Sequence, residues 1–406
     1  MVVFGVGETV RMAVVVRVIS ADEVDEFLRV DQLAFQFRPD KNEPQGSESW
    51  ARGELDRAFG AFDGSTMVGI GRNYSFDVTV PGGARVPAAA VSWIGVLPTH
   101  RRRGILTALM DALADDSRQR GEPVSMLTAS EGSIYRRFGY GCAVDRVACT
   151  IDSRSSEFVA SWRDAGSVRF VTADEAATRF PLIYEQTRDV VGSVARPDFW
   201  WPEIAFERAE GPQFFAMHET DGVADGFVGW RVTGDWIGGV VDRTVEVFDL
   251  QAATPEARLA LWRFVLDIDL TRQVKCFQVP LHDPVRWVLA DVRQRRLDFV
   301  NDGLWVKVLD VATLLQTRRY EVDDELVMAI DGVNWRLTVA DGTGSCSATT
   351  DGPDLTLPAD VLGAVSLGQR RVSEFPGLTD VNDPSVLARA DRLFATSDRA
   401  AMLSYF

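Results

Sequence analysis

A strand, a short turn and an amphipathic helix follow one another twice along this chain. The first copy joins a strand at residues 91–96 to a helix at residues 104–120, and the second joins residues 245–250 to residues 254–266. The first helix carries apolar residues on one face, namely Ile105, Leu109, Ala112 and Leu113. The second turn lacks the glycine and the arginines of the first. We therefore predict an internal duplication whose second member kept the scaffold and lost the basic turn.

Three segments can be distinguished in the 406 residues, a length typical of two or three domains. In the first we expect strands at 14–19, 58–62, 67–80, 88–96 and 124–128, a helix at 21–37 after the N-cap residue Ser20, and a helical turn at 134–138. In the third we expect strands at 304–308, 325–330, 334–339 and 355–357, and helices at 359–367 and 384–395. The fold class is thus α/β with mixed sheets. The predicted domains are residues 1–152, 153–300 and 301–406.

The charge balance narrows the class of partner. The chain has 43 basic and 59 acidic residues, a net charge of -16, while its 46% hydrophobic and 25% charged residues are typical of a folded globular protein. A strongly negative protein repels phosphate backbones and anionic lipid head groups, so nucleic acid is not an expected partner. Cations such as polyamines or basic peptides fit this charge better.

The cysteines and the N-terminal segment bear on the compartment. Cysteine occurs at Cys142, Cys149, Cys276 and Cys346, which are too few and too scattered for a disulfide framework or a Cys-x-x-Cys metal site. We interpret them as reduced thiols of a cytoplasmic protein. The apolar residues 2–18 are interrupted by Glu8, Arg11 and Arg17, so we expect neither a signal peptide nor a membrane span. The sequence leaves open whether translation starts at Met1 or Met12.

Three arginines and a glycine, Arg101 to Gly104, fill the turn of the first copy. The backbone N–H groups of residues 102–106 would be the unpaired donors of a helix N-terminus, where the helix dipole favours an anion. Gly104 permits close backbone approach, and the arginines add positive charge. A solvated basic turn is the alternative. Three successive arginines in a chain of net negative charge favour a pyrophosphate site.

This turn resembles the pyrophosphate loop of the GNAT acetyltransferases, Gln/Arg-x-x-Gly-x-Gly/Ala, with Leu106 departing at the last position. Pro98-Thr99-His100-Arg101-Arg102-Arg103-Gly104, followed about 25 residues later by Ala129-Ser130-Glu131-Gly132-Ser133-Ile134-Tyr135-Arg136-Arg137-Phe138-Gly139-Tyr140-Gly141, resembles the Eis (enhanced intracellular survival) family of N-acetyltransferases. The resemblance extends over essentially the whole chain. It implies an active GNAT domain, a second GNAT-like domain without the cofactor loop, a sterol-carrier-like C-terminal domain and assembly into a homo-hexamer.

The resemblance also implies acetyl-CoA as the acetyl donor, with no metal. The residues implied in binding it are Arg101, Arg102, Arg103, Gly104, Ile105 and Leu106 at the turn, Ile94, Gly95 and Val96 on the preceding strand, and Ser130. The strand would pair with the amides of the pantetheine arm. The backbone N–H of Ile94 would face the thioester oxygen and stabilise the negative charge that develops there.

Two further groups are implied for the chemistry itself. Tyr135 occupies the family's general-acid position, and an ordinary tyrosine pKa of about 10 would keep it protonated at neutral pH. From the residues alone, a packing aromatic on a short helix is the simpler interpretation of Tyr135. The family's base is the C-terminal carboxylate, here on Phe406, and burial would raise its pKa from the weakly basic ordinary value of about 3.5.

The acceptor pocket is less well defined. Phe35 matches a family position that lines the acceptor cleft, and we add Trp93 and Glu131 as candidate substrate-binding residues. Phe37 and Tyr405 stand where family members carry acidic residues, which removes negative charge from a site expected to hold polycations. Asp31 and Glu131 are the candidates to supply that charge, although each is equally consistent with a solvated or capping group.

Other chemistries have little support in the sequence. The three histidines, His100, His218 and His282, lack metal-ligand spacing, and no Gly-x-Ser-x-Gly or Gly-x-x-x-x-Gly-Lys-Ser/Thr motif occurs. Direct acetyl transfer to a small polycationic amine such as an aminoglycoside is the first hypothesis. A protein or peptide lysine acetyltransferase and a non-enzymatic carrier of apolar ligands are the alternatives.

Overall fold

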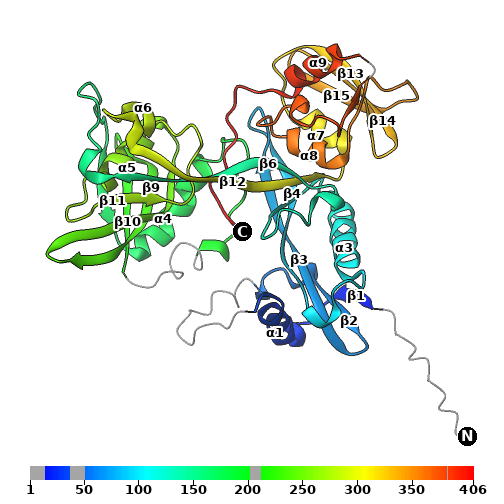
Figure 1. Cartoon of the computed structure of the whole chain (residues 1–406), viewed down its shortest axis with the longest axis horizontal. Helices are drawn as coiled ribbons and strands as arrows, with labels where there is room; N and C mark the ends of the chain where they lie inside the picture. Colours follow the sequence, from blue (N-terminus) through cyan, green and yellow to red (C-terminus); the bar gives the residue numbers. More distant parts are fainter. Residues whose placement is uncertain (1–13, 37–50, 202–211, 382) are drawn as a thin grey trace, which may run out of the picture. The chain divides into compact units, whose positions relative to one another are not determined.

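The computed structural model describes residues 14–36, 51–201, 212–381 and 383–406 (Figure 1). The chain divides into two compact units. Unit 1 consists of residues 1–74 and 91–119, and unit 2 consists of residues 75–90 and 120–406. Residues 75–90 are the tip of one long hairpin, so its two strands contribute to both units. The α/β class with mixed sheets that the sequence predicts is confirmed by the element order.

Unit 1 is built on an antiparallel meander. Its strands are β1 (Val15–Val18), β2 (Ala58–Asp63), β3 (Thr66–Thr79) and β4 (Arg85–Val96), and its helices are α1 (Val24–Phe35) and α3 (Ile105–Gln119), with 3-10 turns η1 (Ala21–Glu23), η2 (Leu55–Arg57) and η3 (Pro98–His100). β1 pairs with β2 and β2 with β3, both antiparallel. The core beneath α1 is formed by Val24, Phe27 and Val30 together with side chains from β2 and β3.

Two glycines on β3 let α3 lie close to the sheet. A Cβ built on Gly69 would come within 3.0 Å of Ile105 and 3.3 Å of Leu109, and one on Gly71 within 3.2 Å of Leu113. These α3 residues are the apolar face that the sequence indicates, and all three are buried. Because Gly69 and Gly71 are two residues apart, both face the same side of the pleated strand. The packing thereby fixes where α3 begins.

Unit 2 contains a second, larger group of strands. Their order across the sheet is β5 (Val124–Thr128), β12 (Arg295–Val308), β6 (Gly141–Asp152), β11 (Gln273–Cys276), β10 (Val240–Ala252), β9 (Val223–Ile237), β8 (Gln213–Thr220) and β7 (Ser167–Val171). Helices α4 (Ala173–Gln186), α5 (Pro255–Leu266) and α6 (Val285–Val288) and 3-10 turns η4 (Arg136–Phe138), η5 (Ser153–Ser155) and η7 (Val292–Gln294) accompany them. β10 and β11 are parallel and joined through α5, so the second copy of the repeated motif forms a strand–helix–strand crossover.

The C-terminal part of unit 2 has its own small sheet. The order is β15 (Thr343–Ala348), β14 (Val333–Ala340), β13 (Asp324–Ile330), β16 (Leu355–Thr356) and β17 (Asp380–Val381), with helices α7 (Val311–Thr317), α8 (Ala359–Val365) and α9 (Ser385–Phe394) and the 3-10 turn η8 (Val372–Glu374). Helix α8 lies directly on β6 and β12, since a Cβ on Gly141 would collide with Asp360 O and one on Gly363 with Val306 O. The ion pair between Arg136 and Asp360 (2.8 Å) reinforces this contact.

Several elements differ from the sequence prediction. Residues 304–308, expected in the third segment, are the end of β12 and pair with β5 and β6 instead of the small sheet. The expected helix 21–37 begins as the 3-10 turn η1, where the backbone N–H of Ser20 donates to Glu23 (2.9 Å), and α1 ends at Phe35 because Gln36 adopts a left-handed conformation. Phe37 and Met12 lie outside the described residues.

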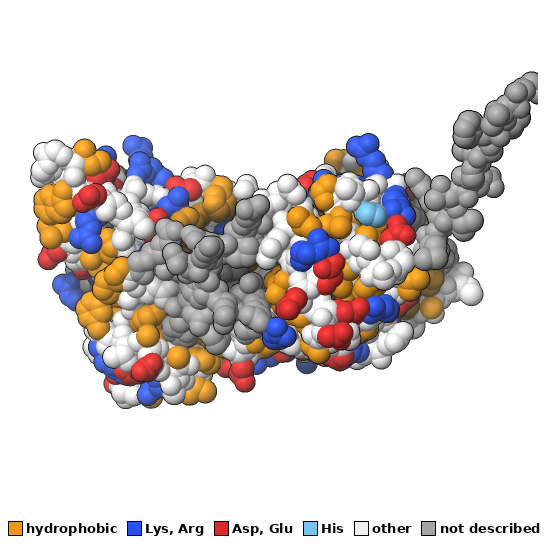
Figure 2. Space-filling view, turned by 90° about the horizontal axis from the view of Figure 1, so that it is seen from below, with side chains coloured by type: hydrophobic (Ala, Val, Ile, Leu, Met, Phe, Trp, Pro, Cys, Tyr) orange, Lys and Arg blue, Asp and Glu red, His pale blue; other side chains and the backbone are white. Residues whose placement is uncertain are grey.

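The excess of acidic over basic side chains is not concentrated on the face shown in Figure 2, where acidic and basic side chains lie next to one another. All four cysteines are unpaired thiols. Within the described residues, no helix is long and apolar enough to cross a membrane.

Candidate functional site

The basic turn joins η3 to α3 in unit 1. Arg102 and Gly104 have left-handed backbone angles, with φ of 61° and 78°. Such a conformation costs a residue with a side chain roughly 1–2 kcal/mol, and glycine avoids the penalty. A Cβ built on Gly104 would meet no heavy atom within 4 Å, so packing inside the protein does not require glycine there. Space beside an exposed glycine at the start of a 15-residue helix fits the approach of a phosphate group.

The three arginines of the turn differ in what their side chains contact. Arg103 donates to Asp63 (2.9 Å), and Arg101 reaches the carbonyl of Ala34 in the last turn of α1 (3.4 Å). Arg102 is exposed and has no hydrogen bond or ion pair within the described ranges. Arg102 is therefore the arginine whose guanidinium can turn to an anion without giving up a partner. Ile105 is buried and Leu106 half-buried, so these two can offer backbone N–H groups only.

The end of β4 departs from a regular strand at Trp93, whose φ is 57°. A left-handed residue inside a strand interrupts the pleat, as at a β-bulge, and re-aims the residues beside it. Gly95 is buried with no room for a side chain, because its Cβ would come within 3.1 Å of Ala34 Cβ. Ile94 and Val96 are half-buried. The Trp93 indole is already held on both sides: its Nε1 donates to the Tyr74 hydroxyl (2.9 Å), and its ring lies 5.7 Å from that of Phe27.

Helix α1 presents Phe27, Asp31 and Phe35 at intervals of four residues, hence on one face. Phe27 is buried, Asp31 is 8% exposed and Phe35 is 47% exposed. No hydrogen bond or ion pair links the Asp31 carboxyl to another described residue, and burial raises its pKa to about 6. A buried carboxyl without a partner is costly in a folded protein and is frequent at functional sites.

Tyr135 lies in unit 2 at the start of η4, and it is 6% exposed. Its ring packs edge-on against Tyr140, with centroids 6.2 Å apart. Its hydroxyl forms no hydrogen bond with the described part of the chain, whereas the Tyr140 hydroxyl is paired with Ser125 (2.7 Å). Burial raises the pKa of Tyr135 to about 12, and interactions with Glu131 and Tyr405 act in the same direction. Glu131 itself is exposed.

The C-terminal segment 401–406, which we call the tail, ends beside β5. The Thr128 hydroxyl donates to the main-chain oxygen of Phe406 (3.0 Å), and the Phe406 ring packs edge-on against Phe76 at 5.3 Å. Phe406 is 7% exposed. Tyr405 is exposed, and the Arg146 guanidinium lies 5.5 Å from its ring centroid. The tail thus brings Phe406 to Thr128, the last residue of β5. Thr128 lies two residues before Ser130, which is exposed.

The predicted residues therefore fall into two groups. Unit 1 holds the basic turn, the end of β4 and Phe35, and unit 2 holds Ser130, Glu131, Tyr135 and Phe406. Sequence reasoning did not single out Thr128 as a functional residue. Only its position at the end of a strand, immediately before the Ala129–Gly141 motif, marked it.

The equivalent turn in the second copy is built differently. Thr254 caps α5 by accepting a hydrogen bond from the Ala257 N–H (3.1 Å), Pro255 occupies the first helical turn without an N–H, and Glu256 adds negative charge there. All three features disfavour an anion at this helix start. This agrees with a second copy that lost its basic turn.

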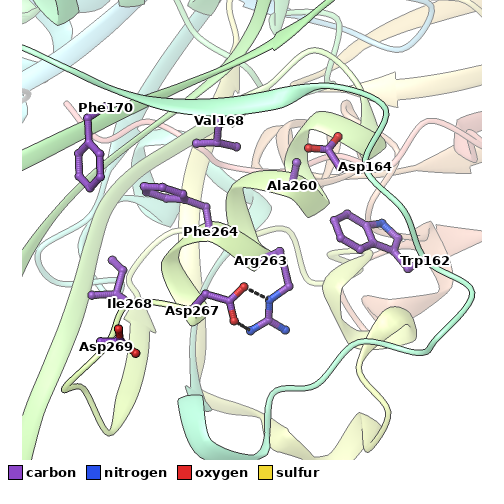
Figure 3. Close-up of a pocket in the computed structure, with 10 residues that line it drawn as sticks. All are labelled: Trp162, Asp164, Val168, Phe170, Ala260, Arg263, Phe264, Asp267, Ile268 and Asp269. Atoms are coloured by element: carbon purple, nitrogen blue, oxygen red, sulfur yellow. Dashed lines mark hydrogen bonds and ion pairs between the residues drawn. The ribbon is translucent and has the colours of Figure 1, made fainter.

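A cavity of about 540 Å³ lies farther along α5 (Figure 3). It is lined by Trp162, Asp164, Val168, Phe170, Ala260, Arg263, Phe264, Asp267, Ile268 and Asp269. The Arg263 guanidinium is bound to Asp267 (2.6 Å) at the C-terminal end of the helix. Carboxylates and a helix C-terminus repel phosphate, so this cavity does not replace the missing turn.

The chain resembles known families along most of its length. An acetyltransferase (GNAT) domain family matches residues 15–143, a second acetyltransferase (GNAT) domain family matches residues 192–308, and the sterol carrier protein domain family matches residues 311–404. N-acetyltransferase Eis of Mycobacterium tuberculosis is 34% identical over 357 residues, which cover 83% of this chain and 85% of that protein. The chain belongs to the Eis family of N-acetyltransferases.

Further relatives agree with this assignment. An uncharacterized N-acetyltransferase of Streptomyces avermitilis is 37% identical over 330 residues, 78% of this chain and 80% of that protein. The structure of Eis1 from Mycobacterium abscessus superposes with a TM-score of 0.86 at 31% identity, covering 97% of this chain and all of that one. A GCN5-related N-acetyltransferase from Anabaena variabilis gives a TM-score of 0.84 with coverage of 97% and 100%, and at 17% identity it shows the fold alone. The Eis-family protein is thus an N-acetyltransferase with two GNAT domains and a sterol-carrier-like domain.

Proposed function

We propose that this N-acetyltransferase moves the acetyl group of acetyl-CoA directly to an amine of a small polycation, such as an aminoglycoside. The observation that carries the proposal is the Tyr135 hydroxyl. A tyrosine that serves only packing usually pairs its buried hydroxyl, as Tyr140 does with Ser125. The Tyr135 hydroxyl, in contrast, has no hydrogen-bond partner among the described residues, and it lies near Tyr405 in the segment that ends at Phe406. This argues against a scaffold that merely carries an apolar ligand.

The acetyl donor is proposed to bind through the turn and the end of β4. Arg102 supplies an exposed positive charge, Gly104 supplies space, and the first N–H groups of α3, including those of Ile105 and Leu106, supply donors. The Arg101 side chain is hydrogen-bonded to Ala34 and the Arg103 side chain to Asp63. Their proposed role is therefore to hold the shape of the turn and to contribute positive electrostatic potential. Gly95, Val96 and Ser130 are proposed to contact the donor along the strand, with the Ile94 N–H stabilising the thioester oxygen.

The bound thioester supplies the acetyl group, and residues of this chain handle the protons. The Phe406 carboxylate is proposed to accept the proton of the attacking amine, and the Thr128 hydroxyl holds one oxygen of that residue. Tyr135 is proposed to donate to the departing sulfur. With a pKa of about 12 it stays protonated throughout neutral pH, but it is a weaker acid than a thiol of ordinary pKa about 8.5. The Tyr135 hydroxyl is therefore expected to stabilise the negative charge that develops on sulfur through a hydrogen bond. Complete transfer of its proton early in the step is not expected.

The acceptor is proposed to be a polycation bound by carboxylates and aromatic rings. Phe35 is the exposed aromatic of α1, and Trp93 is packed on the same helix through Phe27. Asp31 lies on the same helical face and has no cationic partner within the described part of the chain, and Glu131 is exposed beside Tyr135. A cationic amine would supply the opposite charge that Asp31 lacks.

Three further features are proposed on the family resemblance. They are the division into domains at 1–152, 153–300 and 301–406, assembly into a homo-hexamer, and a cytoplasmic location, which the unpaired cysteines support. Sedimentation of the purified protein as a monomer would contradict the hexamer.

Thermal-shift titration and an acceptor panel test the function together. A ligand at 100 times its dissociation constant adds about 2.7 kcal/mol to stability, so acetyl-CoA should raise the melting temperature clearly. CoA release should then be fastest with aminoglycosides and polyamines. Faster turnover of lysine peptides would favour the protein acetyltransferase. Stabilisation by fatty acids but not by acetyl-CoA would favour the carrier.

A further inference from the structure

The tail crosses the second GNAT-like domain before it reaches β5. The backbone N–H of Ala401 donates to Val191 O (2.9 Å), and Gln251 Nε2 on β10 donates to Leu403 O (2.9 Å). Trp200 Nε1 donates to Tyr405 O (3.1 Å). The carbonyls of residues 403 and 405 thus each find a side-chain donor from this domain. Because these contacts use the tail's backbone, they fix its path and register independently of side-chain packing.

One buried arginine joins these contacts. The Arg196 side chain is 1% exposed and pairs through both terminal nitrogens with Asp249 (2.7 and 3.1 Å). Its Nε donates to Ser404 Oγ (2.8 Å), and a terminal nitrogen also donates to Leu403 O (3.2 Å). The Tyr184 hydroxyl donates to Val194 O (2.7 Å), so Ser404 must be the donor in its 2.8 Å contact with Tyr184.

Aromatic rings enclose the guanidinium. Arg196 lies 3.9 Å from the ring centroid of Tyr184 and 4.0 Å from that of Trp200. A buried ion pair often gains little or nothing over apolar residues of the same volume, since both charges lose water. The pair is better explained by its geometry: a planar guanidinium fixed by Asp249 presents its remaining N–H groups rigidly. Those groups are directed at Leu403 and Ser404.

We propose that the second GNAT-like domain, which lacks the basic turn, serves as the docking site for the tail, and that Arg196 is a positioning residue that sets where the Phe406 carboxylate lies. The catalytic part of this inference rests on the proposed role of that carboxylate as base. The docking part does not depend on whether that carboxylate is the base. Arg196 touches neither the reacting atoms nor Phe406 directly, and acts through residues 403 and 404.

The test removes both charges together, so that no buried charge is left alone. The variant is Arg196→Gln with Asp249→Asn, and the matched control is Arg258→Gln with Asp283→Asn. Arg258 and Asp283 form a buried pair in the same domain (2.7 Å), and their hydrogen bonds run to Leu250, Trp262 and Val285, none of which is hydrogen-bonded to the tail. A control with the same chemistry separates loss of the tail contacts from loss of a buried ion pair.

Two independent readouts are measured on the full-length enzyme. Release of Phe406 by a carboxypeptidase, followed by mass spectrometry, reports tail docking. Steady-state kinetics report kcat and the KM for acetyl-CoA. We expect Phe406 to be released at least 10-fold faster from the Arg196/Asp249 variant, with kcat reduced roughly 10²-fold and KM within 2-fold of wild type. The control pair should resemble wild type in both.

The outcomes separate the inference from the function beneath it. Release of Phe406 at the wild-type rate would overturn docking by Arg196. Faster release with unchanged kcat would leave docking in place and would overturn the positioning role of Arg196, whereas the carboxylate base is tested separately by converting Phe406 to its amide. If the double variant does not fold, Trp200→Phe keeps an aromatic ring at this position, removes the donor to Tyr405 O, and reduces the ring surface beside Arg196. It should give a smaller change in the same two readouts, and unchanged release would again overturn docking.

Discussion

The hydroxyl of Thr128, the last residue of β5, donates a hydrogen bond of 3.0 Å to the main-chain oxygen of Phe406, although 278 residues separate the two in sequence. If this bond orients a carboxylate that accepts protons, Thr128→Val should lower kcat about 10-fold, because valine keeps the shape and loses the donor. Thr150→Val is the matched control. Thr150 lies on β6 and donates to Asp298 (2.8 Å), so its loss should affect stability and leave kcat unchanged.

The carboxylate itself is tested by replacing it with an amide. Semisynthetic protein ending in the amide of Phe406 keeps the ring against Phe76 and loses the negative oxygen. We expect kcat to fall at least 10²-fold at equal acetyl-CoA occupancy. A residue appended after Phe406 should have a similar effect, while an N-terminal tag should not. Full activity of the amide would show that the base is another group.

Tyr135→Phe should reduce kcat by roughly 10²-fold to 10⁴-fold with little change in affinity for acetyl-CoA, since only the proton donor is lost. Because burial raises the pKa of Tyr135 to about 12, the wild-type rate should show no alkaline decline from this group below about pH 10. Tyr140→Phe is the comparison: it breaks the bond to Ser125 and should cost about 1 kcal/mol of stability with a much smaller change in kcat. Equal kcat for Tyr135→Phe and wild type would return Tyr135 to a packing role.

The proposed pyrophosphate site is tested by substituting two glycines that have similar backbone conformations. Gly104 and Gly121 have φ of 78° and 73°, and a Cβ on either would meet no heavy atom within 4 Å. Gly104→Val and Gly121→Val should therefore lose similar stability, roughly 1–2 kcal/mol. Only Gly104→Val should weaken acetyl-CoA binding, by at least 10-fold in calorimetry. Comparable affinities in the two variants would place the phosphate elsewhere.

Asp31 should make stability depend on pH. Its pKa is raised from 3.8 to about 6 by burial, so the folded state binds more protons than the unfolded state in this window, and stability falls as pH rises from about 4 to about 6. Asp31→Asn removes the charge. It should be more stable than wild type by about 3 kcal/mol at pH 7.5 and equal to it near pH 4, measured by urea unfolding. A variant less stable than wild type at both pH values would mean that Asp31 has a partner that favours its charge.

Local structure was largely accessible from the sequence. The strand 124–128 was predicted with its observed bounds, and α3 and α5 begin within one residue of the predicted positions, because period, caps and glycine turns are encoded by neighbouring residues. The end of α1 was set by a left-handed Gln36, which propensity does not reveal. The strand 304–308 was found but assigned to the third segment, since no local pattern specifies which sheet a strand joins.

The sequence by itself determined the repeated strand–turn–helix, the arginines and glycine of the turn, and the motif around Tyr135, all of which lie within short windows where spacing is meaningful. Only the tertiary structure decided which of these side chains already form hydrogen bonds or ion pairs within the protein. It engages Arg103 with Asp63 and Tyr140 with Ser125, whereas Arg102, the buried Asp31 and Tyr135 have no hydrogen-bond or ion-pair partner among the residues that the structure describes. It also joins Arg196 to Ser404 and Thr128 to Phe406. Contacts between residues more than 200 positions apart depend on how whole domains pack, and no local pattern in the chain encodes them.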